Sequence, residues 1–239
     1  MFWRDLPQLT AVAAVWIYWS SVLVMVIRSH LRYKTQAGAV PHTAKEIAMW
    51  MIWVPAILLW QFVPTWANQA PPWAGEAAIS FITAPVALTQ TAALQPLRWM
   101  GALLAVAAFA ATVHCWFFMG SNWSMAVVPS KDTGLITQGA FSRVRHPIYA
   151  LSIVLMLGTL ITAPSPAVAV LAAIHWTMLT LKTLSEEEFL LSSHGDSYAR
   201  YMKRTGRFFP KLIVPAEAPV KAEPASPKAR KSVVKRNAA

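Results

Sequence analysis

Long apolar runs dominate the pattern of hydrophobic and polar positions along this chain. A helix needs about 20 apolar residues to cross the ~30 Å hydrocarbon core of a bilayer. Runs that reach or approach this length predict membrane-spanning helices at residues 9–27, 47–62, 100–119, 148–161 and 166–181. The last two form a hairpin, whose short first arm requires tilting or local thinning of the bilayer. We therefore predict an all-α integral membrane protein with about five transmembrane helices.

A further apolar segment, residues 77–94, is ambiguous because it contains a proline, three threonines and a glutamine. Cytoplasmic loops carry an excess of Lys and Arg, which decides between the alternatives. Basic residues gather in three stretches: 28–45, 120–147 and from Lys182 onward. All three lie on one side of the membrane only if 77–94 does not cross it. We predict an interfacial or re-entrant segment there, with the N-terminus outside and the C-terminus in the cytoplasm.

The charge of the chain is unevenly distributed. The net charge is +11, although only 13% of the residues are charged against about a quarter in a soluble domain. The basic residues lie in predicted inside loops and in a Pro/Ala/Lys-rich tail, 211–239, so no nucleic-acid-binding face is predicted. The tail has too few apolar residues to fold and is predicted to be disordered. Either it attracts anionic lipids, at about 1 kcal/mol per basic residue, or it is solvated without a role.

The chain offers little that would bind a metal. Cys115 is its only cysteine, so this chain alone forms neither a disulfide nor a Cys-based metal site. His114 and His175 lie in predicted spans, and we expect both to be satisfied inside the bundle rather than to act as ligands. No metal site is predicted. A GxGxxG motif is also absent, which argues against a soluble Rossmann-type domain.

Two polar segments, 131–149 and 182–201, bracket the hairpin. Because the hairpin crosses the membrane and returns, both segments are expected to meet at the inner surface. Arg145-His146-Pro147 reads as a helix start, since proline is favoured at the first helical position and His146 then becomes the N-cap. The free N–H groups and the dipole of such an end attract a carboxylate, and Arg145 beside it adds positive charge.

The second segment begins with an acidic cluster, Glu186-Glu187-Glu188. Carboxylates close to lipid are costly and usually face a cavity or a partner. Successive helical residues point about 100° apart, so at most one or two of the three can line a site. Lys182 and Glu186 are four residues apart and share a helix face. An ordinary ion pair where the helix leaves the membrane is the alternative interpretation.

At these two segments the chain resembles the isoprenylcysteine carboxyl methyltransferase family, and the phospholipid N-methyltransferases share much of the pattern. The resemblance covers residues 132–210 and rests on these motifs: Gly139-x5-Arg145-His146-Pro147-x-Tyr149, Glu186-Glu187-x2-Leu190 and Gly195-x2-Tyr198-x2-Tyr201. Together with the apolar runs and the composition of the tail, it divides the chain into three predicted regions. Residues 1–119 form N-terminal transmembrane helices, 120–210 form the methyltransferase region, and 211–239 form the tail.

The resemblance further implies a cytosolic pocket for S-adenosylmethionine with a lateral opening to lipid. By position, cofactor contacts fall on these residues: Thr133, Leu135, Ile136, Phe141, His146, Pro147, Tyr149 and Glu186. Arg145 suits the cofactor carboxylate. Lys182 stands where the family has a substrate-contacting arginine, and lysine cannot bind a carboxylate with the same two-pronged geometry. Two further positions depart from the family. Phe141 occupies the position of a tyrosine, and Thr133 occupies the position of a histidine in the eukaryotic pattern.

Several functions remain open at this point. One is O-methylation of a carboxylate on a lipophilic, isoprenylcysteine-like molecule, with Lys182 holding the carboxylate. Another is N-methylation of an ethanolamine phospholipid, for which Glu187 or the more distant Glu188 would be the general base. S-methylation of a small thiol is a third enzymatic alternative. A non-catalytic membrane scaffold or transporter subunit is the alternative of another class. The compact chain suggests a bacterial inner membrane.

Overall fold

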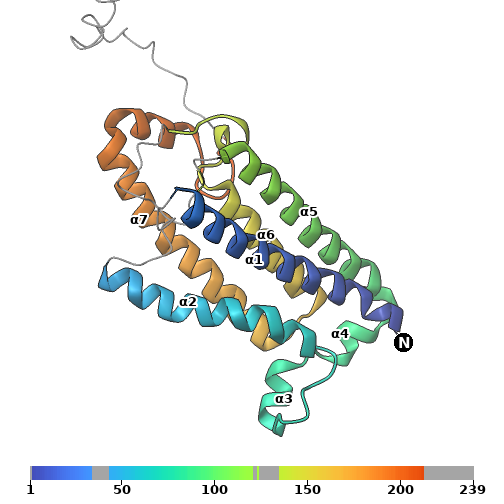
Figure 1. Cartoon of the computed structure of the whole chain (residues 1–239). Coiled ribbons are helices and arrows are strands. Elements are labelled where there is room, and N and C mark those ends of the chain that lie inside the picture. Colours follow the sequence, from blue (N-terminus) through green and yellow to red (C-terminus); the bar gives the residue numbers. More distant parts are fainter. Residues whose placement is uncertain (1, 34–42, 121–122, 124–134, 213–239) are drawn as a thin grey trace, which may run out of the picture.

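A computed structural model describes residues 2–33, 43–120, 123 and 135–212 (Figure 1). Five long helices form the bundle: α1 (Leu6–Tyr33), α2 (Ala44–Phe62), α5 (Gln95–Met119), α6 (Pro147–Thr162) and α7 (Pro166–Arg204). Within the described residues there is no strand, only an isolated parallel bridge between Val144 and Gly206. All of these helices except α6 are long and apolar enough to cross a membrane, and α6 is apolar but shorter. The all-α membrane fold predicted from the apolar runs is confirmed.

Helices α5 and α6 pack backbone against backbone through small residues. A Cβ atom added at Gly158 of α6 would lie 2.6 Å from the carbonyl oxygen of Gly101 and 2.9 Å from the nitrogen of Ala105 on α5. Ala102 and Ala108 are buried along the same stripe of α5. Small residues allow this close approach, which replaces the hydrophobic driving force that is missing between helices in lipid.

Short elements fill the end of the bundle at which the N-terminus lies (Figure 1). They are η1 (Phe2–Arg4), η2 (Val63–Trp66), α3 (Glu76–Ile82), α4 (Val86–Gln90) and η3 (Ala92–Leu94). Segment 77–94 is therefore broken into pieces that are each too short to cross the hydrocarbon core, since a helix rises only about 1.5 Å per residue. This agrees with the prediction that it does not span the membrane. Whether it is interfacial or re-entrant stays a prediction.

Arg98 connects several segments at this end of the bundle by hydrogen bonds. This role was not predicted from the sequence. Its side chain is buried and donates hydrogen bonds to the carbonyl oxygens of Thr162 (3.1 Å), Thr89 (2.6 Å) and Arg4 (2.6 Å). These carbonyls belong to the end of α6, to α4 and to η1. Because one guanidinium donates all of these hydrogen bonds, it holds the last turn of α6, where the hairpin reverses, against the segment that precedes α5.

The two histidines expected inside the bundle behave differently. His175 is buried, accepts a hydrogen bond from Trp53 Nε1 at 3.1 Å and lies 2.9 Å from Ser152 Oγ. The prediction that it is satisfied by its neighbours is confirmed. The same prediction for His114 is wrong, because its side chain is exposed on the outside of α5. His114 lies off the buried stripe of α5, on which residues such as Thr112 are found.

Helix α7 continues well past its apolar part, residues 166–181, which is the predicted span. It bends sharply at Gly195, whose φ is +50°, a backbone conformation that glycine adopts at little cost. The residues after the bend turn back toward the start of α6 (Figure 1). Tyr201 donates a hydrogen bond of 2.6 Å from its hydroxyl to the carbonyl of Phe141. The bend therefore folds the end of α7 over the segment that precedes α6.

Candidate functional site

The two polar segments that bracket the hairpin meet at one end of the bundle. Tyr149, in the first turn of α6, donates a hydrogen bond of 2.7 Å to Glu186 Oε1 on α7. His146 Nδ1 lies 3.6 Å from Glu186 Oε2. At the same end of the bundle, Lys45 Nζ at the start of α2 lies 3.5 Å from Ser185 Oγ on α7. The predicted meeting of the two hairpin ends is confirmed.

His146 and Pro147 begin α6 in the predicted way. His146 is the N-cap, and Pro147 is the first helical residue. The His146 ring is buried and stacks on Tyr149, with ring centroids 5.7 Å apart and planes 11° from parallel. Its Nε2 atom lies 3.3 Å from Glu187 Oε1 but lacks the alignment of a hydrogen bond. The imidazole is thus held between the two carboxylates of α7.

Glu186 is the more exposed of the two carboxylates, with 14% of its side chain exposed against 5% for Glu187. Its Oε1 atom accepts from Tyr149 and lies 3.5 Å from Lys182 Nζ. Lys182 is only 4% exposed, so this is a buried pair rather than a surface ion pair at a membrane exit. The Lys182–Glu186 face is therefore directed into the bundle.

Glu187 is the most tightly held carboxylate of the site. Arg145 Nε donates to its Oε1 at 2.9 Å, and Arg207 donates to both oxygens at 3.1 and 2.7 Å. Burial would raise the pKa of Glu187, but the contacts with His146, Arg207 and Arg145 hold it well below its usual range. The same pairing raises the pKa of Arg207. A carboxylate stabilised so strongly in its ionised form is a poor proton acceptor.

This geometry changes two predicted roles. Glu187 was a candidate general base, but its oxygens are occupied by two arginines, so we assign it a structural role. Arg145 was expected to face the cofactor carboxylate, yet its guanidinium binds Glu187 and the carbonyl oxygens of Met202 and Thr205. The sequence could not reveal this, because Arg207 and Thr205 return to the site only after the bend in α7. Glu188, the more distant candidate base, is exposed.

The remaining predicted cofactor residues precede α6 in the chain. Phe141, in the short helix η5 (Gly139–Ser142), is buried, and its ring lies 6.4 Å from that of Phe118. Leu135 and Ile136 are half-buried in the segment before η5, and their role stays a prediction. Thr133 lies outside the described residues, as does the predicted tail from residue 213 onward.

Comparison with known proteins connects this geometry to a family. Residues 100–193 match the isoprenylcysteine carboxyl methyltransferase (ICMT) family. This matched region contains most of α5, all of α6 and the first part of α7. It includes His146, Tyr149 and the acidic cluster, so the site described above lies mostly within it. The chain is therefore similar to this family of membrane methyltransferases over the region that carries the site.

Three curated relatives align with parts of this chain. The chain is 30% identical over 95 residues to the nickel-cobalt-cadmium resistance protein NccN of Alcaligenes xylosoxydans xylosoxydans. It is also 30% identical over 95 residues to the cobalt-zinc-cadmium resistance protein CzcN of Cupriavidus metallidurans. Over 76 residues it is 32% identical to the protein-S-isoprenylcysteine O-methyltransferase of Schizosaccharomyces pombe.

These alignments cover 39%, 39% and 31% of this chain. They cover 45%, 44% and 32% of the respective relatives, so the chain matches less than half the length of each. The names of the first two concern metal resistance. Among the residues that the structure describes, no group of three or more His, Cys, Asp or Glu side chains is placed to hold a metal ion.

The charges in the matched region can be compared with the polar end of S-adenosylmethionine, which carries a carboxylate, an amino group and a sulfonium. Near the site, two buried side-chain atoms have no hydrogen-bond partner among the residues that the structure describes: His146 Nε2 and Tyr198 Oη. Buried polar atoms are rarely left unpaired, so they point to a ligand or water at this place. The carboxylates of Glu186 and Glu187 face the side chains of Lys182, Arg145 and Arg207. The cluster thus offers charges of both signs.

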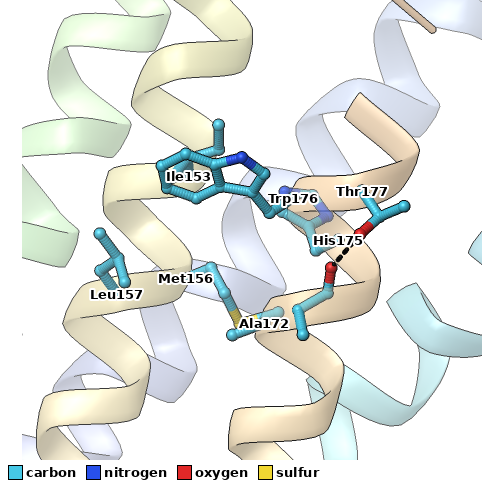
Figure 2. A pocket seen from close by; sticks show the side chains of 8 residues that line it. Ile153, Met156, Leu157, Ala172, His175, Trp176 and Thr177 are labelled. Carbon is cyan, nitrogen blue, oxygen red and sulfur yellow. Dashed lines mark hydrogen bonds between the residues drawn. The ribbon is translucent and has the colours of Figure 1, made fainter. Parts of the chain in front are cut away.

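An apolar groove lies beside this site, between α6 and α7 (Figure 2). Its volume is about 370 Å³, and these residues line it: Ile153, Met156, Leu157, Ala172, Ala173, His175, Trp176 and Thr177. Leu157 and Trp176 remain 39% exposed, so the groove opens on the outside of the bundle. Ile153 is one helical turn after Tyr149, which places the groove next to the polar site.

Proposed function

We propose that this protein is an S-adenosylmethionine-dependent methyltransferase that O-methylates a carboxylate on a lipophilic, isoprenylcysteine-like acceptor. The observation that carries the proposal is the placement of Glu186 against Tyr149, Lys182 and His146 in the ICMT-family region. These side chains come from both arms of the hairpin. They combine a carboxylate, an ammonium group and a helix N-terminus at one end of an apolar bundle.

The residues divide into those that suit the cofactor and those that suit the acceptor. Glu186 would receive the cofactor's amino group, and the free N–H groups at the start of α6 would receive its carboxylate. When bound, the cofactor supplies a methyl group activated by its sulfonium. The protein's own contribution is to align the two reactants and exclude water, because such a displacement needs no covalent nucleophile.

Neither Glu187 nor Glu188 is placed to act as a base, which favours a carboxylic acid over an amine or a thiol as the acceptor. An amine arrives protonated and a thiol largely so, and both need a base. Glu187 is committed to two arginines and Glu188 is exposed. A carboxylic acid arrives ionised and needs only a cation to hold it. Lys182, buried beside Glu186, would provide that cation.

The groove between α6 and α7 supports a lipophilic acceptor. Trp176 lies six residues before Lys182 on α7, or about 9 Å along the helix axis. An apolar chain in the groove would therefore reach the polar site with its head group near Lys182. The basic residues at this end of the bundle support a cytoplasmic site, and we propose the bacterial inner membrane as the location, with the N-terminus outside.

The test is methyl transfer by the purified protein in detergent, supplied with methyl-labelled S-adenosylmethionine. Three acceptors would be compared: an S-prenylated N-acetylcysteine, its carboxamide, and phosphatidylethanolamine. The proposal expects a base-labile methyl ester on the first and no label on the other two. Label on the ethanolamine lipid would overturn the carboxylate assignment, and absence of cofactor binding would overturn the enzymatic one.

A further inference from the structure

The segment after α7, residues 205–209, forms what we call the C-terminal strap. It runs beside the start of α6 and pairs with it through the backbone. The N–H of Arg145 donates to the carbonyl of Gly206 at 2.8 Å, and the N–H of His146 donates to the carbonyl of Arg207 at 3.1 Å. The N-cap of α6 is therefore held by the strap directly.

The strap also reaches the same histidine through a side chain. The guanidinium of Arg207 donates hydrogen bonds to both carboxylate oxygens of Glu187. Such a bidentate pair fixes the orientation of the two side chains in addition to pairing their charges. Glu187 Oε1 in turn lies 3.3 Å from His146 Nε2. His146 is thus confined at its backbone by the Arg207 carbonyl and at its ring by the carboxylate that Arg207 holds.

Two further features fix the shape and the position of the strap. Gly206 is buried, and a Cβ atom there would lie 1.7 Å from the carbonyl oxygen of Phe209, so only glycine fits. The rings of Phe208 and Phe209 lie 6.5 and 6.2 Å from that of Trp176 on α7. Gly206 thus allows the strap to turn tightly on itself, and the aromatic residues attach it to α7.

We propose that Arg207 is a positioning residue for the methyl transfer, which sets the orientation of His146 through the strap and through Glu187. The inference rests on the proposed function and adds to it a residue that lies beyond the ICMT-family match, which ends at residue 193. Arg207 does not touch the reactants in this scheme. Its side chain is 30% exposed, against 5% for that of Glu187.

The experiment follows the ring signals of His146 by NMR in the full chain, labelled with ¹³C,¹⁵N-histidine in detergent micelles. The chain has six histidines, so the His146 signal can be assigned with a His146→Gln variant. Arg207→Ala should shift and broaden that signal. Arg207→Lys keeps the charge and should restore part of the change. Arg200→Ala, an exposed arginine on the same return segment, should leave it as in wild type.

Methyl transfer by the same variants supplies the second measurement. Arg207→Ala should lower kcat about 10- to 100-fold, because a displacement of a positioning group by about 1 Å costs this much. The KM for the acceptor should change less than threefold. Added guanidinium ion at low millimolar concentration should restore part of the lost rate, since it can occupy the vacated place beside Glu187. If Arg207→Ala fails to fold, Arg207→Lys carries both measurements.

The outcomes separate the inference from the proposed function. An unchanged His146 signal in Arg207→Ala, or the same change in Arg200→Ala, would overturn the positioning role even if wild type methylates its acceptor. A shifted signal with a proportionate loss of kcat supports it. If wild type transfers no methyl group, the proposed function fails, and the role of Arg207 in that reaction fails with it.

Discussion

Tyr149 and Glu186 join the two arms of the hairpin, through a hydrogen bond of 2.7 Å between residues 37 positions apart in sequence. The bond orients the carboxylate that we assign to the cofactor's amino group. It also places the Tyr149 ring flat against His146. One residue of α6 therefore arranges both the acidic and the imidazole side of the site, and its hydroxyl can be removed without changing the shape of the ring.

Tyr149→Phe should weaken the binding of S-adenosylmethionine about fivefold, because a hydrogen bond of this kind contributes about 1 kcal/mol. The ring remains, so the thermal midpoint should change little. Calorimetric titration of the purified protein in detergent measures the affinity. Tyr201→Phe is the matched control, since it removes a hydroxyl that binds the Phe141 carbonyl rather than Glu186. Equal affinity losses in both variants would mean that the effect is not specific to Glu186.

Lys182→Met should separate the acceptor from the cofactor. The change keeps the length of the side chain and removes the ammonium group, so the acceptor kcat/KM should fall at least tenfold. The affinity for S-adenosylmethionine should fall by less. Steady-state kinetics with the S-prenylated N-acetylcysteine, together with cofactor titration, provide the two numbers. Lys203→Met, an exposed lysine of the return segment, is the control. A loss confined to cofactor affinity would reassign Lys182 to the cofactor.

Much of this arrangement is predictable from sequence because its determinants are local. Apolar length predicted the five long helices, and Arg145-His146-Pro147 predicted the N-cap and first residue of α6. The hairpin then placed Glu186 beside Tyr149, since a chain that crosses and returns has both ends on one side. The prediction that at most two residues of the acidic cluster can line the site agrees with the structure. Glu186 and Glu187 face the site, and Glu188 is exposed.

The partners of Glu187 were not predictable, because they depend on a long-range return of the chain. Gly195 bends α7, and only then does Thr205 come back to Arg145 and Arg207 to Glu187. No local pattern marks Arg207 among the many basic residues that follow the hairpin. The role of Arg98 was not predictable for a similar reason. Its acceptors are backbone carbonyl oxygens of distant segments, and every residue has such a carbonyl whatever its side chain.

Gly158→Ala should destabilise the bundle, because the added methyl group meets backbone atoms of Gly101 and Ala105 that cannot move independently. Overpacking of this kind costs about 1–3 kcal/mol, and the thermal midpoint in detergent should fall by several degrees. Gly75→Ala is the matched control, since a Cβ there meets nothing within 4 Å and its φ is −73°. Equal midpoints for both variants would contradict the close packing of α5 on α6.

The charged network around Glu187 predicts how stability depends on pH. The pKa of Glu187 lies well below its ordinary value of 4.5 in the folded protein, so its ionised form stabilises the fold. The sign follows from linkage: this stabilisation is fully present above the unfolded-state pKa and is lost as the pH falls below it, toward the folded-state pKa. Near pH 7 the contribution should therefore be constant, and the loss should begin below about pH 5.

Glu187→Gln tests this dependence, because glutamine keeps the shape of the side chain and does not titrate. At pH 7 the variant should melt at a lower temperature than wild type, since Arg145 and Arg207 lose their counter-charge. As the pH is lowered from 5 to about 3, wild type should lose the stabilisation from Glu187, and the two midpoints should converge. Glu188→Gln, which changes an exposed carboxylate of the same cluster, should follow wild type throughout. A gap between wild type and Glu187→Gln that is independent of pH would show that Glu187 acts through its shape and not through its charge.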